Sequence, residues 1–487
     1  MNVARLLERS ALYFPARTAL VAGDRSWTYK ALDDEVSALA GGLAALGLRA
    51  GERISLHLPN RPEFVLVYYA AHKLGLVPLS LNVTYKADEI EYIVADAAAS
   101  AVVTTQDLVG NLPARGRIPS VRHLIDAADL ETLRAAPLRA VDRDRDETAA
   151  ILYTSATTGR PKGVMLTHAN IVSNTYATVH HLKMTPEDRG LCALPMFHCF
   201  GQNFILNALV TAGGLLVLHE RFVPAEFVAA LSRHRITLLY AVPTMYILFL
   251  SQDKGLEVGS LRLCFSAAAT LPLDVERRWH ERYGHWIHQG YGLTECSPFA
   301  SYNHDVAFRP GSVGTPIENV EMKIADAAGE EVADGELGEI LIKGPNVMKG
   351  YFGNPAATAE AIHDGWLRSG DIGYRDGDGY YFLVDRVKDM INVSGFKVFP
   401  REVEEVLFRH EAVKEAAVIG MPDPVRGEAV KAFVVLHADA RVSADELREM
   451  CRASIATYKV PEAIEFVEGL PKNPTGKVLK KDLRARG

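Results

Sequence analysis

The sequence has few cysteines, and their arrangement excludes two common ways of stabilising a small fold. The five are widely spaced, and no pair is separated by only two residues. Disulfide-rich secreted domains carry even, closely spaced sets of cysteines, and structural zinc sites use paired ones. We therefore expect neither framework, and a reducing, cytoplasmic location fits best.

Long hydrophobic runs and an excess of positive charge are absent too. The most apolar stretch, residues 204–218, is shorter than the ~20 residues that span a bilayer. The N-terminal segment carries Arg5, Glu8 and Arg9 where a signal peptide would need an apolar core, which favours an amphipathic helix. The formal net charge is −7, so no global positive field is available to a polyanion. We expect no membrane span and no nucleic-acid partner.

Several familiar catalytic motifs are also missing. The sequence contains no G-x-S-x-G, H-E-x-x-H or G-x-G-x-x-G segment. Hydrolase, metalloprotease and nicotinamide-dependent functions therefore lack their usual residues.

The length and apolar content of the chain are sufficient for several folded units. The 487 residues, 48% apolar and 23% charged, correspond to about three units at roughly 150 residues each. Short apolar runs alternate with helical stretches up to about residue 310, which predicts an α/β fold with a large N-terminal domain of doubly wound, largely parallel sheets. Residues 310–386 show shorter β-like runs and predict a small β-rich subdomain, and the α+β pattern of residues 387–487 predicts a separate C-terminal domain.

Two helices have recognisable ends. The helical pattern that starts at Tyr29 ends at Gly47. For the helix that reaches Leu74, Asn60 is the expected N-cap with Glu63 as its capping partner, and Gly75 is the expected C-cap.

One segment after an apolar strand combines small hydroxyl residues, glycine and lysine. Such a loop offers backbone N–H groups, hydroxyl donors and a cation to phosphate oxygens, although a plain surface turn is the alternative. The residues that would bind phosphate are Thr154, Ser155, Thr157, Thr158, Gly159 and Lys162.

This segment resembles the phosphate loop of the adenylate-forming superfamily, which comprises acyl-CoA synthetases, luciferases and peptide-synthetase adenylation domains. The resemblance extends over nearly the whole chain. It implies ATP, Mg²⁺ and coenzyme A as cofactor and co-substrates, together with a C-terminal domain that moves.

A second segment, residues 289–295, looks like the adenylate segment of the same superfamily. The resemblance implies that Gln289, Gly290 and Tyr291 bind the nucleotide, with the tyrosine ring on adenine. It further implies that Thr294 contacts the α-phosphate and that Glu295 helps to hold Mg²⁺. A carboxylate beside phosphates suits a hard, oxygen-seeking cation.

A third segment, residues 369–397, contains the residues that the resemblance assigns to ribose binding, to the hinge and to the thiol tunnel. Asp371 would accept both ribose hydroxyls, and Arg386 would also contact the ribose. Lys388 would be the hinge of the C-terminal domain. The loop of Ser394, Gly395 and Phe396 would border the pantetheine tunnel.

A lysine near the C-terminus completes the catalytic set. Lys477 matches the terminal catalytic lysine of the superfamily, and its ammonium would stabilise the anionic charge that builds up as a carboxylate attacks the α-phosphorus. The alternative is a solvated basic tail formed with Lys472, Lys480 and Lys481.

The acyl pocket is expected beside residues 195–204, a segment without any acidic side chain. This absence disfavours an amino acid substrate, because the buried ammonium of such a substrate would lack a partner. The residues expected at the acid are Phe197, His198, Phe200, Gly201, Phe204, Ala267, Ala268 and Ala269. A packed core position is the alternative for His198.

Two departures from the superfamily pattern stand out. Ala156 replaces the usual glycine of the phosphate loop, and Ala267 to Ala269 stand where relatives often have Gly-Gly-Ala. If residue 156 needs positive φ, alanine strains the loop, and Ala156→Gly would raise the rate of pyrophosphate exchange.

These residues together predict an ATP-dependent acid–thiol ligase that acts on a medium- to long-chain fatty acid and on coenzyme A. An aryl-acid CoA ligase and a ligase that loads an acyl carrier protein are the alternatives within the superfamily. A non-catalytic nucleotide-binding protein is the alternative from another class.

Overall fold

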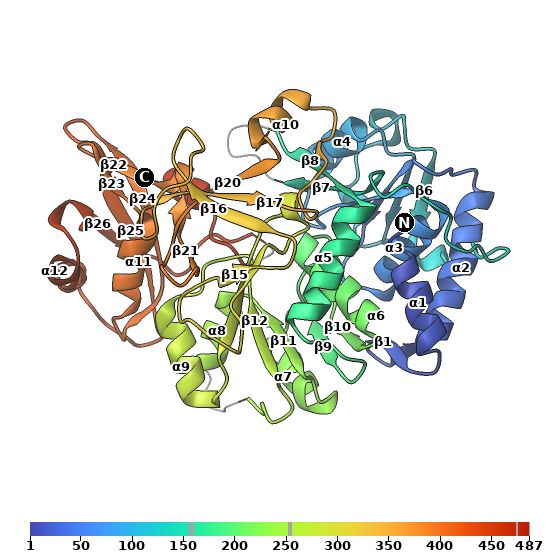
Figure 1. Ribbon diagram of the computed structural model, residues 1–487, viewed down its shortest axis with the longest axis horizontal. Helices are drawn as coiled ribbons and strands as arrows, with labels where there is room; N and C mark the ends of the chain where they lie inside the picture. The colour runs from blue at the N-terminus through green and yellow to red at the C-terminus, as the bar shows by residue number, and fades with distance from the viewer. Residues whose placement is uncertain (155–159, 252–255, 474–475, 487) are drawn as a thin grey trace.

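The computed structural model describes residues 1–154, 160–251, 256–473 and 476–486. Two large mixed sheets with their helices form the right and lower parts of Figure 1, a β-rich unit lies at the top centre, and the C-terminal domain lies on the left. The predicted α/β class with a β-rich subdomain and an α+β C-terminal domain is confirmed.

The first large sheet has the strand order β18-β8-β7-β4-β3-β5-β6. Its parallel strands are β3 (Arg53–His57), β4 (Val77–Ser80), β5 (Ala101–Thr104), β6 (His123–Asp126) and β7 (Thr148–Thr154). The antiparallel strands β8 (Lys162–Thr167) and β18 (Gly350–Tyr351) extend it at one edge. Parallel strands are buried on both faces, which is why these runs read as continuously apolar.

The second large sheet has the order β15-β14-β13-β12-β11-β9-β10-β1-β2. Its strands are β1 (Thr18–Ala22), β2 (Arg25–Thr28), β9 (Arg189–Cys192), β10 (Leu215–Leu218), β11 (Leu238–Ala241), β12 (Leu263–Ser266), β13 (Ile287–Tyr291), β14 (Ser301–Tyr302) and β15 (Thr315–Pro316). Ligands of such sheets bind outside the carboxyl ends of the parallel strands.

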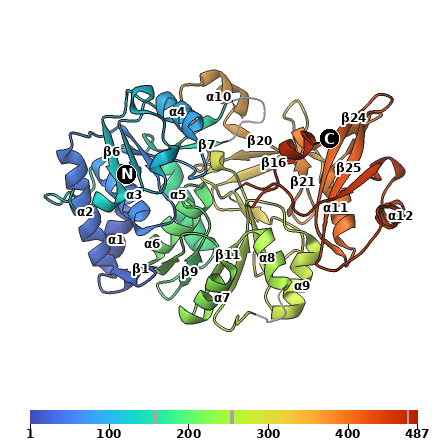
Figure 2. The same ribbon diagram turned by 180° about the vertical axis from the view of Figure 1, so that it is seen from behind.

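Helices cover and separate these two sheets (Figures 1 and 2). They are α1 (Arg5–Tyr13), α2 (Tyr29–Ala45), α3 (Pro62–Leu74), α4 (Ala87–Asp96), α5 (His168–His181), α6 (Ala208–Ala212), α7 (Pro224–Arg233), α8 (Pro243–Leu250) and α9 (Leu273–Tyr283). A π-helix, Phe200–Asn207, precedes α6. α5 contacts β7 and β8 on one side and the π-helix on the other, so it lies between the sheets.

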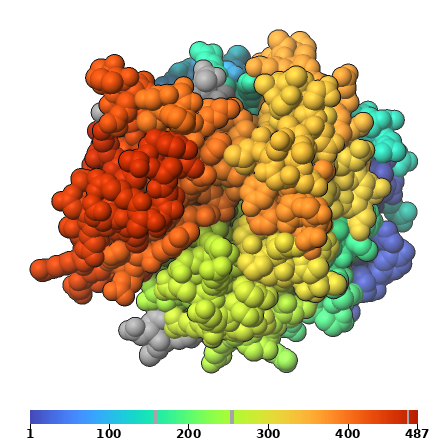
Figure 3. All heavy atoms as spheres, turned by 60° about the vertical axis from the view of Figure 1, so that its left-hand side comes forward, coloured from blue at the N-terminus to red at the C-terminus, as the bar shows by residue number. Residues whose placement is uncertain are grey.

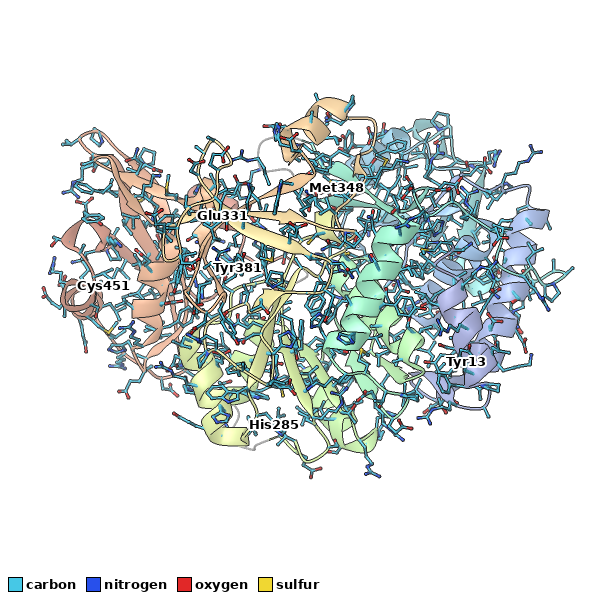
Figure 4. All side chains as sticks on the ribbon, in the orientation of Figure 1. Tyr13, His285, Glu331, Met348, Tyr381 and Cys451 are labelled. Carbon is cyan, nitrogen blue, oxygen red and sulfur yellow. The ribbon has the colours of Figure 1, made fainter. Side chains whose placement is uncertain are left out.

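The β-rich subdomain is an antiparallel sheet. It consists of β16 (Glu321–Ala325), β17 (Gly338–Lys343), β19 (Ile362–His363), β20 (Trp366–Arg375) and β21 (Tyr381–Arg386), with α10 (Pro355–Ala361) beside it. Tyr381, labelled in Figure 4, is buried in this sheet, and its hydroxyl donates to the Met322 carbonyl at 2.5 Å.

The C-terminal domain has a core of its own. Its sheet consists of β22 (Ile391–Val393), β23 (Phe396–Val398), β24 (Val413–Asp423), β25 (Gly427–Leu436) and β26 (Ala463–Phe466), with α11 (Pro400–Phe408), α12 (Ala444–Ser454) and the terminal α13 (Lys480–Arg484). Its buried apolar residues form clusters separate from the N-terminal core. Figure 3 shows this domain, in orange and red, lying against the green-yellow and yellow parts of the N-terminal domain.

Local predictions at helix ends have mixed outcomes. The helix from Tyr29 and the left-handed cap at Gly75 are confirmed. The capping box at Asn60 is wrong, because Pro62 opens α3 directly after Arg61. Asn60 instead bridges to the next sheet, where it donates to the Leu194 carbonyl at 2.7 Å and accepts from the Met196 N–H at 2.8 Å. Glu63 pairs with Arg25 at 3.0 Å.

Among the described residues, every helix is too short or too polar to cross a bilayer.

Candidate active site

Three residues from three strands meet at the expected nucleoside position. Tyr291 ends β13, and Asp371 and Arg386 face each other directly across the β20–β21 pair. The Tyr291 hydroxyl donates to Asp371 Oδ2 at 2.8 Å, and Arg386 Nε lies 3.1 Å from Oδ1. Tyr291 and Asp371 are both buried. The structure therefore fixes the carboxylate that was predicted to accept ribose hydroxyls between a phenol and a guanidinium.

A second group joins the expected metal and phosphate residues. Glu295 lies in the short turn Thr294–Cys296 directly after β13, and burial raises the pKa of its carboxyl. The Tyr351 hydroxyl donates to Glu295 Oε1 at 3.0 Å, and Lys162 Nζ lies 4.9 Å from the centroid of the same tyrosine ring. Tyr351 thus links two predicted site residues, although the sequence analysis did not single it out.

Strand pairing explains this link. β18 pairs with β8 so that Tyr351 faces Val164, which places Lys162 diagonally across from the ring. Met348, which is labelled in Figure 4, lies just before β18, and its N–H donates to the Glu295 carbonyl at 2.8 Å, which ties the two segments together.

Only the two ends of the predicted phosphate loop lie among the described residues. Thr154 ends β7 directly opposite Lys162. The predicted phosphate ligands Ser155, Thr157, Thr158 and Gly159, and the departure at Ala156, lie outside the described residues.

Lys477 of the C-terminal domain reaches this same region. Burial and the positive charge of Arg386 lower the pKa of Lys477 to about 8, while Asp371 acts in the opposite direction. Burial, together with Lys477, lowers the pKa of His198 to about 4. Gly476 packs against the start of α8, since a Cβ there would lie 3.0 Å from Thr244 Oγ1. The structure therefore brings Lys477, His198 and the nucleoside residues together.

The predicted basic tail is not solvated as a whole. Lys472 pairs with Glu415 at 2.7 Å, and the largely buried Lys480 pairs with Glu404 at 2.9 Å, whereas Lys481 is exposed. These ion pairs favour a catalytic role for Lys477 over the alternative of a solvated basic tail.

The acyl-pocket segment forms the π-helix, and its phenylalanines are packed tightly. Phe204 lies 4.6 Å from Phe265, 5.0 Å from Phe299 and 5.2 Å from Phe200, measured between ring centroids. All four rings are at most 5% exposed. Gly201 allows the close turn of the chain here, because a Cβ would clash with the Pro195 carbonyl at 2.4 Å. Phe197 packs at the margin of this core.

The alanine triplet after β12 contains a strained residue. Ala267 and Ala268 pack against the core, and Ala268 has φ +70°. Alanine rarely adopts this left-handed region, which glycine enters freely. Ala269 follows in the same turn before α9.

Two predicted nucleotide residues have packing roles. The Gln289 amide donates to Glu276 at 3.4 Å, and burial raises the pKa of Glu276 to about 7. Gly290 leaves room for the Phe265 ring, because a Cβ would lie 2.4 Å from it. These contacts fix the end of β13 against α9 and against the Phe265 ring. The Gln289 side chain points toward α9.

The predicted hinge and thiol-tunnel residues lie in different places. Lys388 sits in the one-turn segment Val387–Asp389 between the β-rich sheet and the C-terminal domain, and burial and Arg386 lower its pKa. Ser394 and Gly395 form the β22–β23 turn, and Phe396 stacks on Tyr458 at 4.8 Å while 57% exposed. This turn lies at the outer end of the C-terminal domain, so it is not brought to the nucleoside residues (Figure 1).

Comparison with known proteins shows to which family the chain belongs. Residues 7–352 match the AMP-binding enzyme family, and residues 402–477 match the AMP-binding enzyme C-terminal domain. The chain belongs to the AMP-binding enzyme family. The predicted membership in the adenylate-forming superfamily and the AMP-forming acid–thiol ligase chemistry are thereby confirmed.

Members of this family that resemble the chain over its full length act on different acids. A feruloyl-CoA synthase of Amycolatopsis sp is 38% identical, covering 98% of this chain and 97% of the relative. A long-chain-fatty-acid–CoA ligase of Bacillus subtilis is 34% identical, covering 98% and 93%. The crystal structure of an anthranilate CoA ligase in complex with anthranoyl-AMP superimposes with a TM-score of 0.95 at 31% identity, covering 100% and 97%.

Proposed function

We propose that the protein activates a compact aromatic carboxylic acid with ATP and transfers the acyl group to coenzyme A. The observation that carries the choice of acid is the tight packing of Phe200, Phe204, Phe265 and Phe299, and we place the acyl group of the substrate against this cluster. A flat ring fits edge or face against other rings, whereas a long flexible chain needs an open tunnel.

In the first half-reaction, a carboxylate oxygen attacks the α-phosphorus of ATP and pyrophosphate leaves, which forms the acyl-AMP. We assign Lys477 to the developing charge on the phosphoryl oxygens, since its ammonium is close enough to Arg386 and Asp371 for their charges to shift its pKa. We assign Asp371 and Tyr291 to the nucleoside, and Thr294 and Lys162 to the phosphates.

The residues present suit a magnesium ion. Glu295 offers a hard carboxylate, one oxygen of which is already bonded by Tyr351. No group of three His, Cys, Asp or Glu side chains within the described ranges could enclose a metal. Mg²⁺ is commonly held by one or two carboxylates together with substrate phosphates, whose negative charge it offsets.

In the second half-reaction, the thiol of coenzyme A attacks the acyl carbonyl, loses its proton and displaces AMP. We propose that the C-terminal domain, residues 387–487, rotates about Lys388 for this step. The family matches support this boundary, because they leave residues 353–401 between them. The rotation would withdraw Lys477 and bring the turn of Ser394, Gly395 and Phe396 to the site. The thiol of an acyl carrier protein is the alternative acceptor.

A fatty acid is the second candidate substrate, favoured by the 34% identity to the Bacillus ligase. ATP–pyrophosphate exchange with benzoate, a hydroxycinnamate, octanoate and palmitate separates the two. We expect kcat/KM for the better aryl acid to exceed that for palmitate by about tenfold or more, the scale on which pocket shape discriminates. Faster exchange with palmitate overturns the aryl assignment, and no exchange with any acid overturns the adenylation chemistry.

Lys477→Ala tests the division between the half-reactions. We expect acyl-AMP formation to be abolished and thioester formation from supplied acyl-AMP to be retained. Equal loss of both steps contradicts the role of Lys477.

A further inference from the structure

Helix α4 contacts both ends of the predicted phosphate loop. At the entry, the hydroxyl of Tyr153, one residue before Thr154, donates to the Asp96 carboxylate. At the exit, the Tyr92 hydroxyl donates to the Pro161 carbonyl at 3.1 Å. Tyr92 and Asp96 are four residues apart on α4 and therefore lie on the same face of the helix. This face of α4 is a common support for the two ends of the loop.

The ring of Tyr92 makes two further contacts with the same two chain segments. The guanidinium carbon of Arg160 lies 5.1 Å from the centroid of the ring, within the range of a cation–π interaction. The Tyr153 ring meets the Tyr92 ring edge to face, with centroids 6.5 Å apart. Both tyrosines pack against one apolar cluster of the first large sheet and α4. One side chain, Tyr92, thus contacts two consecutive residues at the exit of the loop.

The hydrogen bond from Tyr92 acts on the peptide unit that leads into Lys162. Pro161 directly precedes Lys162, which is the first residue of β8. Because a peptide unit is planar, a bond to the Pro161 oxygen also fixes the orientation of the Lys162 backbone N–H. The Lys162 ammonium in turn lies 4.9 Å from the centroid of the Tyr351 ring. Tyr92 and Tyr351 therefore hold Lys162 at its backbone and at its ammonium.

We propose that Tyr92 is a positioning residue for ATP binding: its hydroxyl and ring fix the backbone before Lys162 and so direct the ammonium to the phosphates that leave as pyrophosphate. The inference rests on the role proposed above for Lys162. It applies to the first half-reaction, because acyl-AMP no longer carries these two phosphates. Transfer of the acyl group from acyl-AMP to the thiol is independent of Tyr92.

Two substitutions in the full-length protein separate the two contacts of Tyr92. Tyr92→Phe removes the hydrogen bond to Pro161 and keeps the ring beside Arg160, so the packing of α4 is retained. We expect its KM for ATP in pyrophosphate exchange to rise about fivefold, the effect of losing one hydrogen bond, with kcat within about twofold of the parent. Tyr92→Leu removes both contacts and should raise this KM about twentyfold. Thioester formation from supplied acyl-AMP should be unchanged in both variants.

A matched control and a double variant distinguish positioning from a general loss of structure. Tyr85→Phe removes a hydroxyl from a tyrosine that packs against the same cluster, and its KM for ATP should equal that of the parent. Lys162→Met is expected to raise the KM for ATP. Adding Tyr92→Phe to Lys162→Met should change the KM by less than about twofold, because Tyr92 acts through the lysine.

The outcomes that contradict the proposal are distinct from those that contradict the function of the site. A parental KM for ATP in Tyr92→Phe, an equal loss of both half-reactions, the same rise in Tyr85→Phe, or a full additional effect in the double variant each overturns the positioning role. If Lys162→Met leaves the KM for ATP unchanged, the role proposed for Lys162 fails. If Lys162→Met raises the KM and Tyr92→Phe does not, the role of Tyr92 alone is refuted.

Discussion

Ala268 occupies a backbone conformation that costs an alanine free energy, with φ +70° directly after β12. We expect Ala268→Gly to raise the free energy of unfolding by about 0.5–1 kcal/mol, because relief of left-handed strain exceeds the added entropy of the unfolded chain. Thermal unfolding and denaturant titration measure this. Ala267→Gly is the control, since its φ is not positive, and it should destabilise. A lower stability of Ala268→Gly would show that no strain is stored at this alanine.

Lys477 sets a pH dependence for adenylation. Its pKa is about 8 in the ligand-free protein, mainly through burial and Arg386. The ammonium is the active form, so kcat/KM for pyrophosphate exchange should be constant below pH 8 and fall tenfold per pH unit above it. Bound ATP adds negative charge, so the corresponding fall in kcat should lie at higher pH. A kcat/KM profile that stays flat to pH 10 would contradict this assignment.

Tyr351 joins the expected magnesium carboxylate to the phosphate-loop lysine. Tyr351→Phe removes the hydrogen bond to Glu295 but keeps the ring beside Lys162, and Tyr351→Leu removes both contacts. We expect the Tyr351→Phe variant to need about fivefold more Mg²⁺ for half-maximal exchange. The Tyr351→Leu variant should show the same change and also a higher KM for ATP. Binding of Mg²⁺ and ATP by calorimetry gives a second readout. Identical behaviour of the two variants would exclude a contribution from the ring.

At the scale of elements, the sequence predicted the strands and the positions of the motifs better than the contacts between them. The motif residues follow apolar runs, and such residues gather at the carboxyl ends of parallel strands. The Tyr351–Glu295 bond depends on the pairing of β18 with β8, whose residues are almost 190 positions apart in the sequence. Local patterns carry no information on such a pairing.

Two further features escaped prediction for local physical reasons. The π-helix Phe200–Asn207 replaces an ordinary α-helical turn, and the apolar pattern of this segment is equally compatible with either geometry. Asn60 was predicted to cap a helix because asparagine favours that position. Its side chain instead hydrogen-bonds to the Leu194 carbonyl, beside the neighbouring sheet. Tertiary partners outweighed the local preference in this case.

The π-helix also gives a prediction about substrate length. Phe204 is its most enclosed aromatic ring, in contact with Phe200, Phe265 and Phe299. Phe204→Ala should open space behind the acid and raise kcat/KM for octanoate relative to benzoate, at a stability cost of about 3 kcal/mol. Phe204→Leu is the milder variant if the first unfolds. An unchanged ratio of the two acids would place the acyl group elsewhere.

At the scale of the whole molecule, the proposed mechanism uses two arrangements of the C-terminal domain, and the structure corresponds to the first of them. Lys477 faces the nucleoside residues, while the turn of Ser394 and Gly395 lies at the outer end of the C-terminal domain. One site can serve two half-reactions only if the domain moves between them. The backbone at Lys388 is the proposed place of that motion.

Proline at residue 388 tests this motion directly. Lys388→Pro fixes φ near about −65° and so restricts rotation at the hinge, whereas Lys388→Ala removes the same side chain and leaves the backbone free. We expect the proline variant to keep pyrophosphate exchange but to lose thioester formation from supplied acyl-AMP by about 100-fold or more, because the thiol turn can no longer reach the site. The alanine variant should perform both steps. Measuring each half-reaction separately checks this, and a proline variant that forms thioester at the parental rate would show that the domain does not turn at this residue.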